Sequence, residues 1–589
     1  MRRYISFAAA LLACAAVNAQ NLNPTVQVTN DYEGKLMEVE KRNVGMAVPD
    51  SLLKFDWNFN YSVFDNPYKG AYEFSPYRIE MKPDATVRDN RRFYLRAGAG
   101  YSLHPEAQVV FTPAVKGRFG VSVYDDFQGY MGPYHNITAL TQSSGPYLVG
   151  PDGNYDGYGF SNRAGTTLRY DAPSAVITLD GGFDLIRTKD NLDTGNNAMG
   201  GSAALRARSI SPSDFLYDIS LGWKYIGNNV TFKYGDARFT EHDAGLDSRF
   251  IYHLADKHSL RFEPSWHHVI FNESAGSSTA DAVDLAPSYV FSDGGFSFKA
   301  GVRYSDVWRS YDSYSFPPEG YKGRKVYPDL SVYYEAVPEE LVLTAKFTGG
   351  QHFNTYRSYL ESNRHLSFMS SWNYGTAIGD ATVNTFDAGV GISGRIRSRF
   401  QYAAEAGYAR YFNAPLDGIG TTYFSKEGIT SSTSVETVFV PVLSMMNYDL
   451  MYATVKGDLT SDRIDAAARL KLQKSNLNPD SEKGYFAMNL PLFSGSAEIV
   501  YNWNRRIFVG LAAGWSTSRE GKGMYTSFDT TFDTTMPGWI DLGVTAEYRM
   551  NNRFSLWAEG RNLLNQTVMK DFMIAEKGRY FTAGICLNL

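Results

Sequence analysis

The 589-residue chain is poor in cysteine, with only Cys14 and Cys586. Cys14 lies in a stretch that begins with two arginines and continues with a short apolar run over residues 5–16, which are features of a secretory signal peptide. Small residues precede Gln20, so we expect cleavage after Ala19. The mature chain then retains one cysteine, which excludes an intramolecular disulfide. A lipidated Cys14 fits poorly, because a bulky leucine lies two residues before it.

Long hydrophobic runs are also missing. Beyond residue 19 no run of about 18 apolar residues occurs, so no transmembrane helix is expected. The mean hydropathy of -0.32 resembles that of a soluble protein. However, aromatic residues make up 15% of the chain, with 41 tyrosines and 37 phenylalanines, and there are 53 glycines. This composition, with alternating rather than continuous apolar residues, is typical of membrane β-barrels.

The chain has little net charge, because 62 acidic residues oppose 57 basic ones. A formal charge of -5 gives no sign of polyanion binding, so no nucleic acid is expected as a partner. The sequence also lacks a Gly-x-Ser-x-Gly elbow and any recognisable set of nucleophile, base and orienting residue, so we do not expect an enzyme. His267 and His268 are adjacent in an expected strand and point to opposite faces, so they cannot share one metal ion.

Strict alternation of apolar and polar residues is what the chain has instead, most clearly at its end. Five apolar residues of the last strand fall on one face: Phe581, Ala583, Ile585, Leu587 and Leu589. A period of two describes a strand with one apolar and one wetter side. An exported chain that ends on such a strand is a candidate outer-membrane barrel, in which each strand faces lipid on one side and the lumen on the other.

Hairpins repeat this pattern along the chain. Residues 540–550 and 554–559 alternate on either side of Asn551-Asn552-Arg553, and asparagine tolerates the left-handed conformation that such loops need. Other strands carry charges at every second position, and a charged side chain that faces lipid costs about 2–4 kcal/mol at the bilayer midplane. We therefore predict that five such residues face the lumen: Lys299, Arg303, Asp541, Glu547 and Arg549.

Short turns alternate with long polar and aromatic segments, as in bacterial barrels whose short turns face the periplasm and whose long loops face outward. The sequence predicts an all-β fold, a transmembrane antiparallel β-barrel of roughly 22 strands with long extracellular loops. We expect a signal peptide over residues 1–19, a short periplasmic extension over 20–51 and the barrel over 52–589. A soluble β-sandwich or propeller is the alternative, which the long strands and the lack of a blade repeat disfavour.

The C-terminal sequence resembles a known family. Residues 556–565, Leu-Trp-Ala-Glu-Gly-Arg-Asn-Leu-Leu-Asn, and residues 578–584, Gly-Arg-Tyr-Phe-Thr-Ala-Gly, are similar to the end of TonB-dependent receptors of the Bacteroidetes type. The resemblance implies an integral outer-membrane barrel that binds or transports a solute. Leu589 departs from the terminal phenylalanine of many outer-membrane proteins, but it is still a bulky apolar end for the barrel-assembly machinery to recognise.

Receptors of this family carry a globular plug inside the barrel, preceded by a TonB box. Five residues resemble that box, an extended segment offered to TonB for strand addition: Thr25, Val26, Gln27, Val28 and Thr29. An ordinary periplasmic β segment is the alternative. Only residues 31–51 separate this segment from the first expected strand, 52–61, which is too short for a plug. Because a wide ring must be filled, we expect inward-folded loops, residues 20–51 or another protein to fill it.

Candidate sites in the expected external segments are few. Asp152, Asn154 and Asp156 have the spacing of the first half of a calcium loop. The twelfth position is Arg163, which excludes an EF-hand and leaves either a structural Ca2+ site or a polar turn. No other cofactor is expected. Aromatic side chains in these segments either stack on a ligand or pack at the membrane interface, and residues 353–364 could form a short amphipathic helix at the rim.

Three functions remain open at this point. The first is a TonB-dependent-receptor-like barrel that binds or transports a solute across the outer membrane. The second is a plugless scaffold or accessory subunit of an outer-membrane protein complex, and the third is a passive porin. Outer-membrane lipid surrounds the protein in each case, and TonB or other outer-membrane or periplasmic proteins are the candidate partners.

Overall fold

The computed structural model describes residues 92–589, apart from short gaps. The gaps are residues 102, 114–116, 143–144, 190–194, 211–212, 233–234, 274–275, 313–321, 365–380, 398, 426–434, 479–484 and 526–529. The chain divides into two units, residues 1–65 and 66–589, and every described residue belongs to the second. The expected signal peptide and the extension over residues 20–51 therefore lie outside the described residues.

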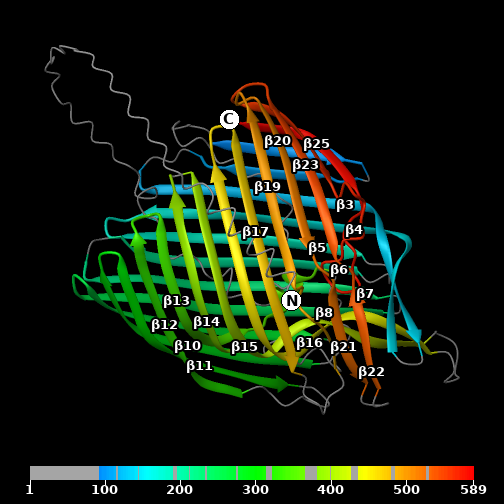
Figure 1. Ribbon diagram of the computed structural model, residues 1–589, viewed down its shortest axis with the longest axis horizontal. Coiled ribbons are helices and arrows are strands. Elements are labelled where there is room, and N and C mark those ends of the chain that lie inside the picture. Colours follow the sequence, from blue (N-terminus) through cyan, green and yellow to red (C-terminus); the bar gives the residue numbers. More distant parts are fainter. Residues whose placement is uncertain are drawn as a thin grey trace, which may run out of the picture. The chain divides into compact units, whose positions relative to one another are not determined.

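Twenty-two strands form one antiparallel sheet in which successive wall strands pair (Figure 1). These strands are β1 (Phe93–Gly100), β2 (Glu106–Phe111), β3 (Phe119–Gln142), β4 (Gly145–Asp171), β5 (Ala175–Lys189), β6 (Gly195–Ser209), β7 (Phe215–Phe232), β8 (Gly235–Ala255), β9 (His258–Glu273), β10 (Gly276–Asp293), β11 (Phe296–Asp312), β12 (Lys322–Val337), β13 (Leu341–Phe353), β14 (Ala381–Ile396), β15 (Phe400–Ser425), β16 (Val435–Thr460), β17 (Ile464–Asn478), β19 (Phe493–Trp503), β20 (Ile507–Ser516), β23 (Trp539–Arg549), β24 (Phe554–Arg561) and β25 (Tyr580–Asn588).

Among the described residues, four further elements lie in the connections between wall strands. Strands β18 (Tyr485–Met488), β21 (Arg519–Tyr525) and β22 (Thr530–Met536) form a separate three-stranded sheet. The helix α3 (Tyr356–Ser362) follows β13. Within the described part of the chain, no helix is long and apolar enough to cross a membrane.

The large sheet closes on itself, because β1 pairs with β2 along one edge and with β25 along the other. The backbones of Phe93 and Leu589 also exchange two hydrogen bonds, of 2.8 and 2.9 Å. The expected antiparallel β-barrel of roughly 22 strands is therefore confirmed. The first strand predicted from the sequence, residues 52–61, lies outside the described residues, and the described ring is complete without it.

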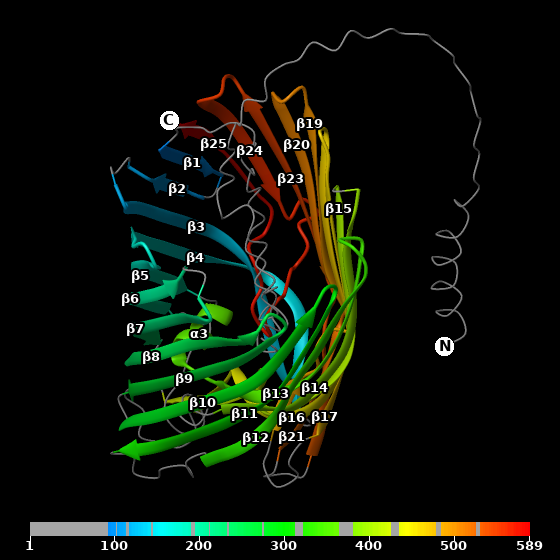
Figure 2. The same ribbon diagram turned by 90° about the vertical axis from the view of Figure 1, so that its left-hand side faces the viewer.

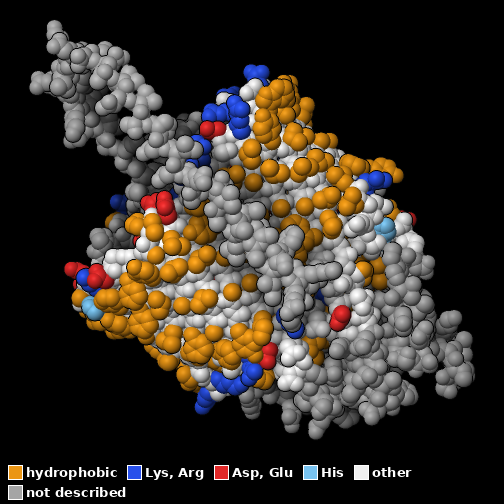
Figure 3. Space-filling view, viewed as in Figure 1, with side chains coloured by type: hydrophobic (Ala, Val, Ile, Leu, Met, Phe, Trp, Pro, Cys, Tyr) orange, Lys and Arg blue, Asp and Glu red, His pale blue; other side chains and the backbone are white. Residues whose placement is uncertain are grey.

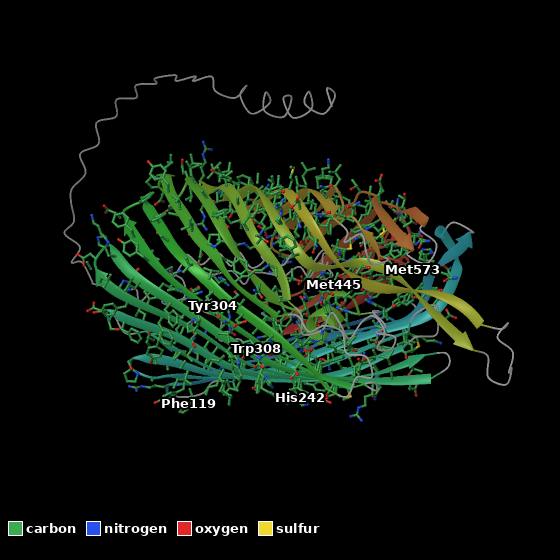
Figure 4. The ribbon with its side chains drawn as sticks, turned by 90° about the horizontal axis from the view of Figure 1, so that it is seen from below. Phe119, His242, Tyr304, Trp308, Met445 and Met573 are labelled. Atoms are coloured by element: carbon green, nitrogen blue, oxygen red, sulfur yellow. The ribbon has the colours of Figure 1, made fainter. Side chains whose placement is uncertain are left out.

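The wall has an apolar outer face, as the alternation predicted. In β23, for example, Ile540 points outward and is 46% exposed. Figure 3 shows apolar side chains over most of the visible wall, with charged side chains gathered toward its margins. In Figure 4, Phe119 and His242 lie outside the ring of strands, whereas Met445 and Met573 lie inside it. A closed ring of this kind satisfies the strands' backbone hydrogen bonds internally, which a lipid environment requires.

Aromatic side chains line the outer face at two levels. Near the short turns, the rings of Phe215 and Phe250 stack with their centres 6.1 Å apart. Farther along β7 and β9, Trp223 and Trp266 are exposed on the same outer face. Two such bands flanking an apolar belt are typical of barrels that span membranes.

Tight turns join the wall strands at one end of the barrel. Between β19 and β20, Asn504 and Arg505 have φ angles of 53° and 58°, as the two central residues of a type I′ turn require. Gly294, with a φ of 56°, takes a similar conformation between β10 and β11. These positions agree with the short turns that the sequence predicted.

One of these turns is shaped differently from its prediction. The expected hairpin after β23 is present, and the N–H of Met550 donates to the carbonyl of Phe554 at 3.1 Å. However, neither Asn551 nor Asn552 is in the left-handed region. The side chain of Asn551 instead accepts hydrogen bonds from the N–H groups of Arg553 and Phe554, at 2.8 and 2.9 Å. Side-chain hydrogen bonding thus replaces the left-handed backbone conformation.

At the opposite end, many strands run on far beyond the length needed to cross a bilayer. Strand β4 has 27 residues, and β15 and β16 have 26 each, whereas a tilted strand crosses a bilayer in about 9–11 residues. The long connections also lie at this end, among them the one after β13 and the one between β24 and β25. These two connections carry the candidate functional site.

Candidate functional site

The five charged residues predicted to face the lumen lie in strands β11 and β23, and their orientation toward the lumen stays a prediction. They are Lys299, Arg303, Asp541, Glu547 and Arg549. Lys299 forms an ion pair with Asp329 at 2.6 Å, and Arg549 forms one with Glu547 at 3.5 Å. Because β11 and β23 are far apart in the ring, these residues do not form a single site.

The other predicted site residues lie elsewhere. The TonB-box-like residues, Thr25 to Thr29, are outside the described residues. Asp152, Asn154 and Asp156 lie within strand β4 rather than in a polar turn, and the side chains of Asn154 and Asp156 are exposed. Among the described residues no group of three or more His, Cys, Asp or Glu side chains could hold a metal ion. The calcium site stays a prediction.

The connection after β13 turns inward and forms α3. Thr355 caps this helix, and its side chain accepts a hydrogen bond from the N–H of Ser358 at 3.1 Å. The buried carboxylate of Glu241, on β8, accepts hydrogen bonds from the N–H groups of Tyr356 and Arg357. These two N–H groups have no partner within the helix. A carboxylate at this end also interacts favourably with the positive end of the helix dipole. The barrel wall therefore supplies part of the helix cap.

Further polar contacts hold both ends of the helix against β5 and β6. The guanidinium of Arg357 forms an ion pair with Asp184 of β5. After the helix, the carbonyl oxygen of Arg364 accepts hydrogen bonds from Thr188 of β5 and Asn196 of β6, each at 3.0 Å. Thr188 and Asn196 are both 2% exposed. Buried polar groups of the wall are thus satisfied by this connection.

An apolar cluster joins the helix to two separate parts of the wall. Tyr356 and Leu360 are both 0% exposed. They pack in one cluster with residues of β6 to β9, namely Ala198, Ile226, Val230, Phe239 and Phe271. Leu443 and Met445 of β16 pack against the same cluster. Because β10 to β15 separate β9 from β16 in the ring, the helix contacts parts of the wall that are not neighbours. Figure 2 shows α3 beside β7 and β8.

The connection between β24 and β25, residues 562–579, is a second inward segment (Figure 4). Its apolar residues form a buried cluster with β3, β18 and β22, composed of Met569, Phe572, Met573, Ala575, Ile137, Met488 and Met536. Arg519 of β21 donates to the carbonyl oxygen of Lys570 at 2.6 Å and to the carboxylate of Asp417, on β15, at 2.9 Å. The segment thus ties several outer extensions of the barrel together.

Lys577 anchors the end of this segment in an aromatic cage. Its ammonium lies 5.2 Å from the ring centre of Tyr130 and 5.3 Å from that of Tyr580. Its Nζ is 3.3 Å from Nε2 of His104. Burial lowers the pKa of Lys577 to about 8. Burial, together with the nearby ammonium, lowers the pKa of His104 to about 3. At neutral pH the cage therefore contains a charged lysine beside a neutral histidine.

Sequence reasoning found one of the two inward segments. The short helix expected within residues 353–364 is present as α3, but it packs inside the ring rather than at the rim. The segment over residues 562–579 was missed, because Met569, Phe572 and Met573 fit neither a strand nor a helix period. Apolar residues without a period between two clear strands were the available signal of an inward-packed loop.

Comparisons with known proteins give a result for structure only. No protein-family model matches the chain, and no curated protein sequence matches it. The FrpB iron transporter from Neisseria meningitidis (F3-3 variant) matches with a TM-score of 0.62 and 10% identity, over 85% of this chain and 82% of that chain. The ferric-catecholate import receptor Fiu from E. coli K12 matches with a TM-score of 0.60 and 8% identity, over 85% and 82%. The copper transporter OprC matches with a TM-score of 0.60 and 9% identity, over 85% of this chain and 80% of that chain.

The likeness is one of fold. The chain shares the barrel architecture of these receptors and transporters, as the resemblance of its C-terminal end to TonB-dependent receptors predicted. The similarity extends over most of each barrel, so it concerns the ring as a whole and not only the last two strands.

Proposed function

We propose that this protein is an outer-membrane receptor of the TonB-dependent type, which binds a solute within its lumen and admits it to the periplasm. The observation that carries the proposal is the inward packing of α3 and residues 562–579 in a 22-stranded ring. A ring of this size encloses a wide lumen, and natural transporters of this size keep it plugged. Similarity of fold to an iron transporter, a ferric-catecholate import receptor and a copper transporter supports the same function.

The contacts of α3 favour a receptor over a passive porin. A porin lumen is a permanent aqueous channel. Here Glu241 caps the helix, Asp184 pairs with Arg357, and an apolar cluster joins β6–β9 to β16. These are the contacts expected of a lumen that stays closed until a solute or a partner changes it.

Planar-bilayer conductance of the full-length protein tests whether the lumen is closed. We expect no large, stable openings from the wild-type barrel. A variant in which residues 354–364 are replaced by a Gly-Ser sequence of equal length should open, because the contacts of α3 are lost. A large steady conductance of the wild-type protein would instead support a porin.

Coupling to TonB is proposed to run through residues 25–29. A cysteine at Thr25 or Val28 should crosslink to TonB in energised cells, and a variant with the order of residues 25–29 scrambled is the control. Absence of a crosslink would remove the coupling from the proposal. If partner proteins also co-purified in fixed stoichiometry, the scaffold function would be favoured.

The proposal includes a route to the membrane. We propose cleavage of residues 1–19, insertion of the barrel by the barrel-assembly machinery and integral residence in an outer membrane of the Bacteroidetes type. Cell fractionation tests this route, because the protein should require detergent for extraction from outer-membrane vesicles. A freely dissolved protein in the periplasm or the medium would contradict it.

A further inference from the structure

A row of aromatic and polar side chains crosses strands β7 to β11 on one face of the wall. In the register of the sheet, Trp223 of β7 lies opposite Ala244 of β8, which lies opposite His268 of β9. His268 lies opposite Asp281 of β10, and Asp281 lies opposite Trp308 of β11. Residues directly opposite each other in adjacent strands have Cβ atoms about 5 Å apart, so the row is continuous.

This row faces away from the lumen. His268 is three positions from Phe271, which packs against α3 inside the ring. Successive residues of a strand point to opposite faces, so His268 faces outward. Residues paired across neighbouring strands share a face, so the whole row points outward. Accordingly, Trp223 and Trp308 are 45% and 39% exposed.

The row lies where the wall leaves the bilayer. A tilted strand crosses the bilayer in about 9–11 residues. Counted from the short-turn end, Trp223 is the ninth residue of β7 and His268 is the eleventh residue of β9. Asp306 is the eleventh residue of β11, two positions before Trp308 and on the same face. Because the short turns of such barrels face the periplasm, these side chains lie among the headgroups of the outer leaflet.

Two aspartates of this surface keep part of their hydrogen-bonding capacity. Nδ1 of His268 lies 2.8 Å from Oδ1 of Asp281. Asp306 accepts hydrogen bonds from Nε of Arg324, on β12, at 3.0 Å and from the hydroxyl of Tyr304 at 3.2 Å, both through Oδ2. A carboxylate offers about four acceptor positions. Each aspartate therefore retains acceptors for a further ligand.

Indole rings flank these carboxylates. Trp266 stacks beside His268, with ring centres 6.2 Å apart, and Trp223 and Trp308 lie at the two ends of the row. Tryptophan alone is typical of the membrane interface, and the carboxylates among the indoles are the additional feature. Charged side chains on the lipid face are tolerated near the interface but not at the bilayer midplane. The surface is therefore matched to headgroups and not to acyl chains.

The charges of this surface favour an uncharged headgroup. Asp281 and Asp306 each face a basic partner, so no basic group is left to balance a phosphate. A sugar presents C–H groups on the faces of its ring, which pack on indoles. It presents hydroxyl groups at its edge, which donate charge-assisted hydrogen bonds to carboxylates. Indole faces beside carboxylate acceptors therefore fit a hydroxyl-rich group.

We propose that Trp223, Trp266, Trp308, Asp281 and Asp306 form a binding site for the sugar headgroup of a glycolipid in the outer leaflet. The site is on the outside of the barrel, so it is distinct from α3 and from residues 562–579, which pack inside the ring. It goes beyond the proposed receptor function, because it requires only that the barrel span the membrane.

Photolabelling of the full-length protein in phosphatidylcholine vesicles tests the site. One probe is a galactosyl diacylglycerol with a diazirine on its sugar, and the other is a phosphatidylcholine with a diazirine in its choline headgroup. We expect the sugar probe to label β7–β12 in preference to the rest of the wall, and the choline probe to label all sides of the barrel alike. The same distribution of label from both probes would overturn the site.

Variants locate the recognition in individual side chains. Asp281→Asn should lower labelling of β7–β12 by the sugar probe roughly tenfold, the value of a hydrogen bond to a charged group. Trp308→Leu removes an aromatic face and should lower it about fivefold. Labelling by the choline probe should not change in either variant.

Trp503→Leu is the matched control, because Trp503 is exposed at the short-turn end of β19. It should leave the sugar label on β7–β12 unchanged. Heat-modifiable migration in SDS gels checks that each variant folds. Unchanged sugar labelling in folded Asp281→Asn and Trp308→Leu, or an equal decrease in Trp503→Leu, would count against the site.

Discussion

Glu241 is a buried carboxylate on the inner wall, and both of its oxygens accept N–H groups of a helix that is 115 residues away in sequence. Arg357, in the same helix, pairs with Asp184 across 173 residues. A buried charge that loses its partner destabilises a protein by several kcal/mol (about 3–5), so wall and helix depend on each other. Such partners are brought together only by the closed ring, and no local sequence pattern indicates them.

Glu241→Gln is expected to loosen α3. The amide retains one acceptor oxygen for two N–H donors, so one donor of the buried helix end is left unsatisfied, at a cost of about 1–3 kcal/mol. We expect brief channel openings in planar bilayers that the wild-type protein does not show. The matched control is Glu335→Gln, because Glu335 accepts the N–H of Glu339 at the short-turn end, away from α3. Openings of equal frequency in both variants would contradict a role for Glu241 in closure.

The cage around Lys577 predicts a rise in stability at alkaline pH. The pKa of Lys577 is lowered by burial from 10.5 to about 8. The unfolded chain therefore holds this proton more tightly than the folded one, and stability rises with pH between about 8 and 10.5. Thermal unfolding of the wild-type protein, compared with Lys577→Met across this range, isolates the contribution. The difference in thermal stability between the two proteins should change by a measurable amount above pH 8. It should stay constant just below pH 8.

His104 predicts a loss of stability at acidic pH. Its pKa is lowered from 6.5 to about 3, so the folded protein keeps the ring neutral where the unfolded chain takes up a proton. Stability is therefore lost as the pH falls below about 6.5 toward 3. His104→Phe should lose less stability over this range than the wild-type protein does. A parallel decrease in both proteins would show that His104 is not responsible.

At the scale of elements, the strands were predictable and the inward segments only in part. A period of two is a local property, so residues 540–550 and 580–589 identify their strands without knowledge of their neighbours. Helix α3 was expected from its sequence, but its burial depends on Phe239 and Phe271, which lie on other strands.

Tyr356 tests how strongly α3 is attached to the wall. Its ring packs between Phe239 and Phe271, with ring centres 5.6 and 5.5 Å away, and its hydroxyl accepts a hydrogen bond from Asn228 at 2.7 Å. Tyr356→Phe removes only the hydroxyl and should lower the free energy of unfolding by about 1 kcal/mol. Tyr356→Ala also leaves a cavity and should cost about 3–5 kcal/mol. Bilayer openings should therefore be rare in the first variant and frequent in the second.

At the scale of the whole molecule, the seam between β1 and β25 makes the sheet a barrel. Gly98 and Gly584 lie directly opposite each other across this seam. The indole of Trp557 packs over Gly98, and the guanidinium of Arg96 lies 3.9 Å from the centre of that indole. Small residues at the seam thus allow a large aromatic side chain to lie across it on the inner face. Closure removes both sheet edges, which would otherwise expose unpaired backbone groups to lipid.

Gly584→Val is expected to prevent this closure. A Cβ at position 584 would lie 2.0 Å from the carbonyl oxygen of Ala97 and 2.6 Å from the Cα of Gly98, so backbone atoms of β1 would have to move. The neighbouring residue Ala583 points outward and is exposed, which makes Ala583→Val a control of similar size in the same strand. Heat-modifiable migration in SDS gels measures closure, because folded barrels run faster before boiling than after it. We expect the folded band to be lost or greatly reduced for Gly584→Val and retained for Ala583→Val, since a ring that cannot close leaves β1 and β25 with unpaired edges in lipid.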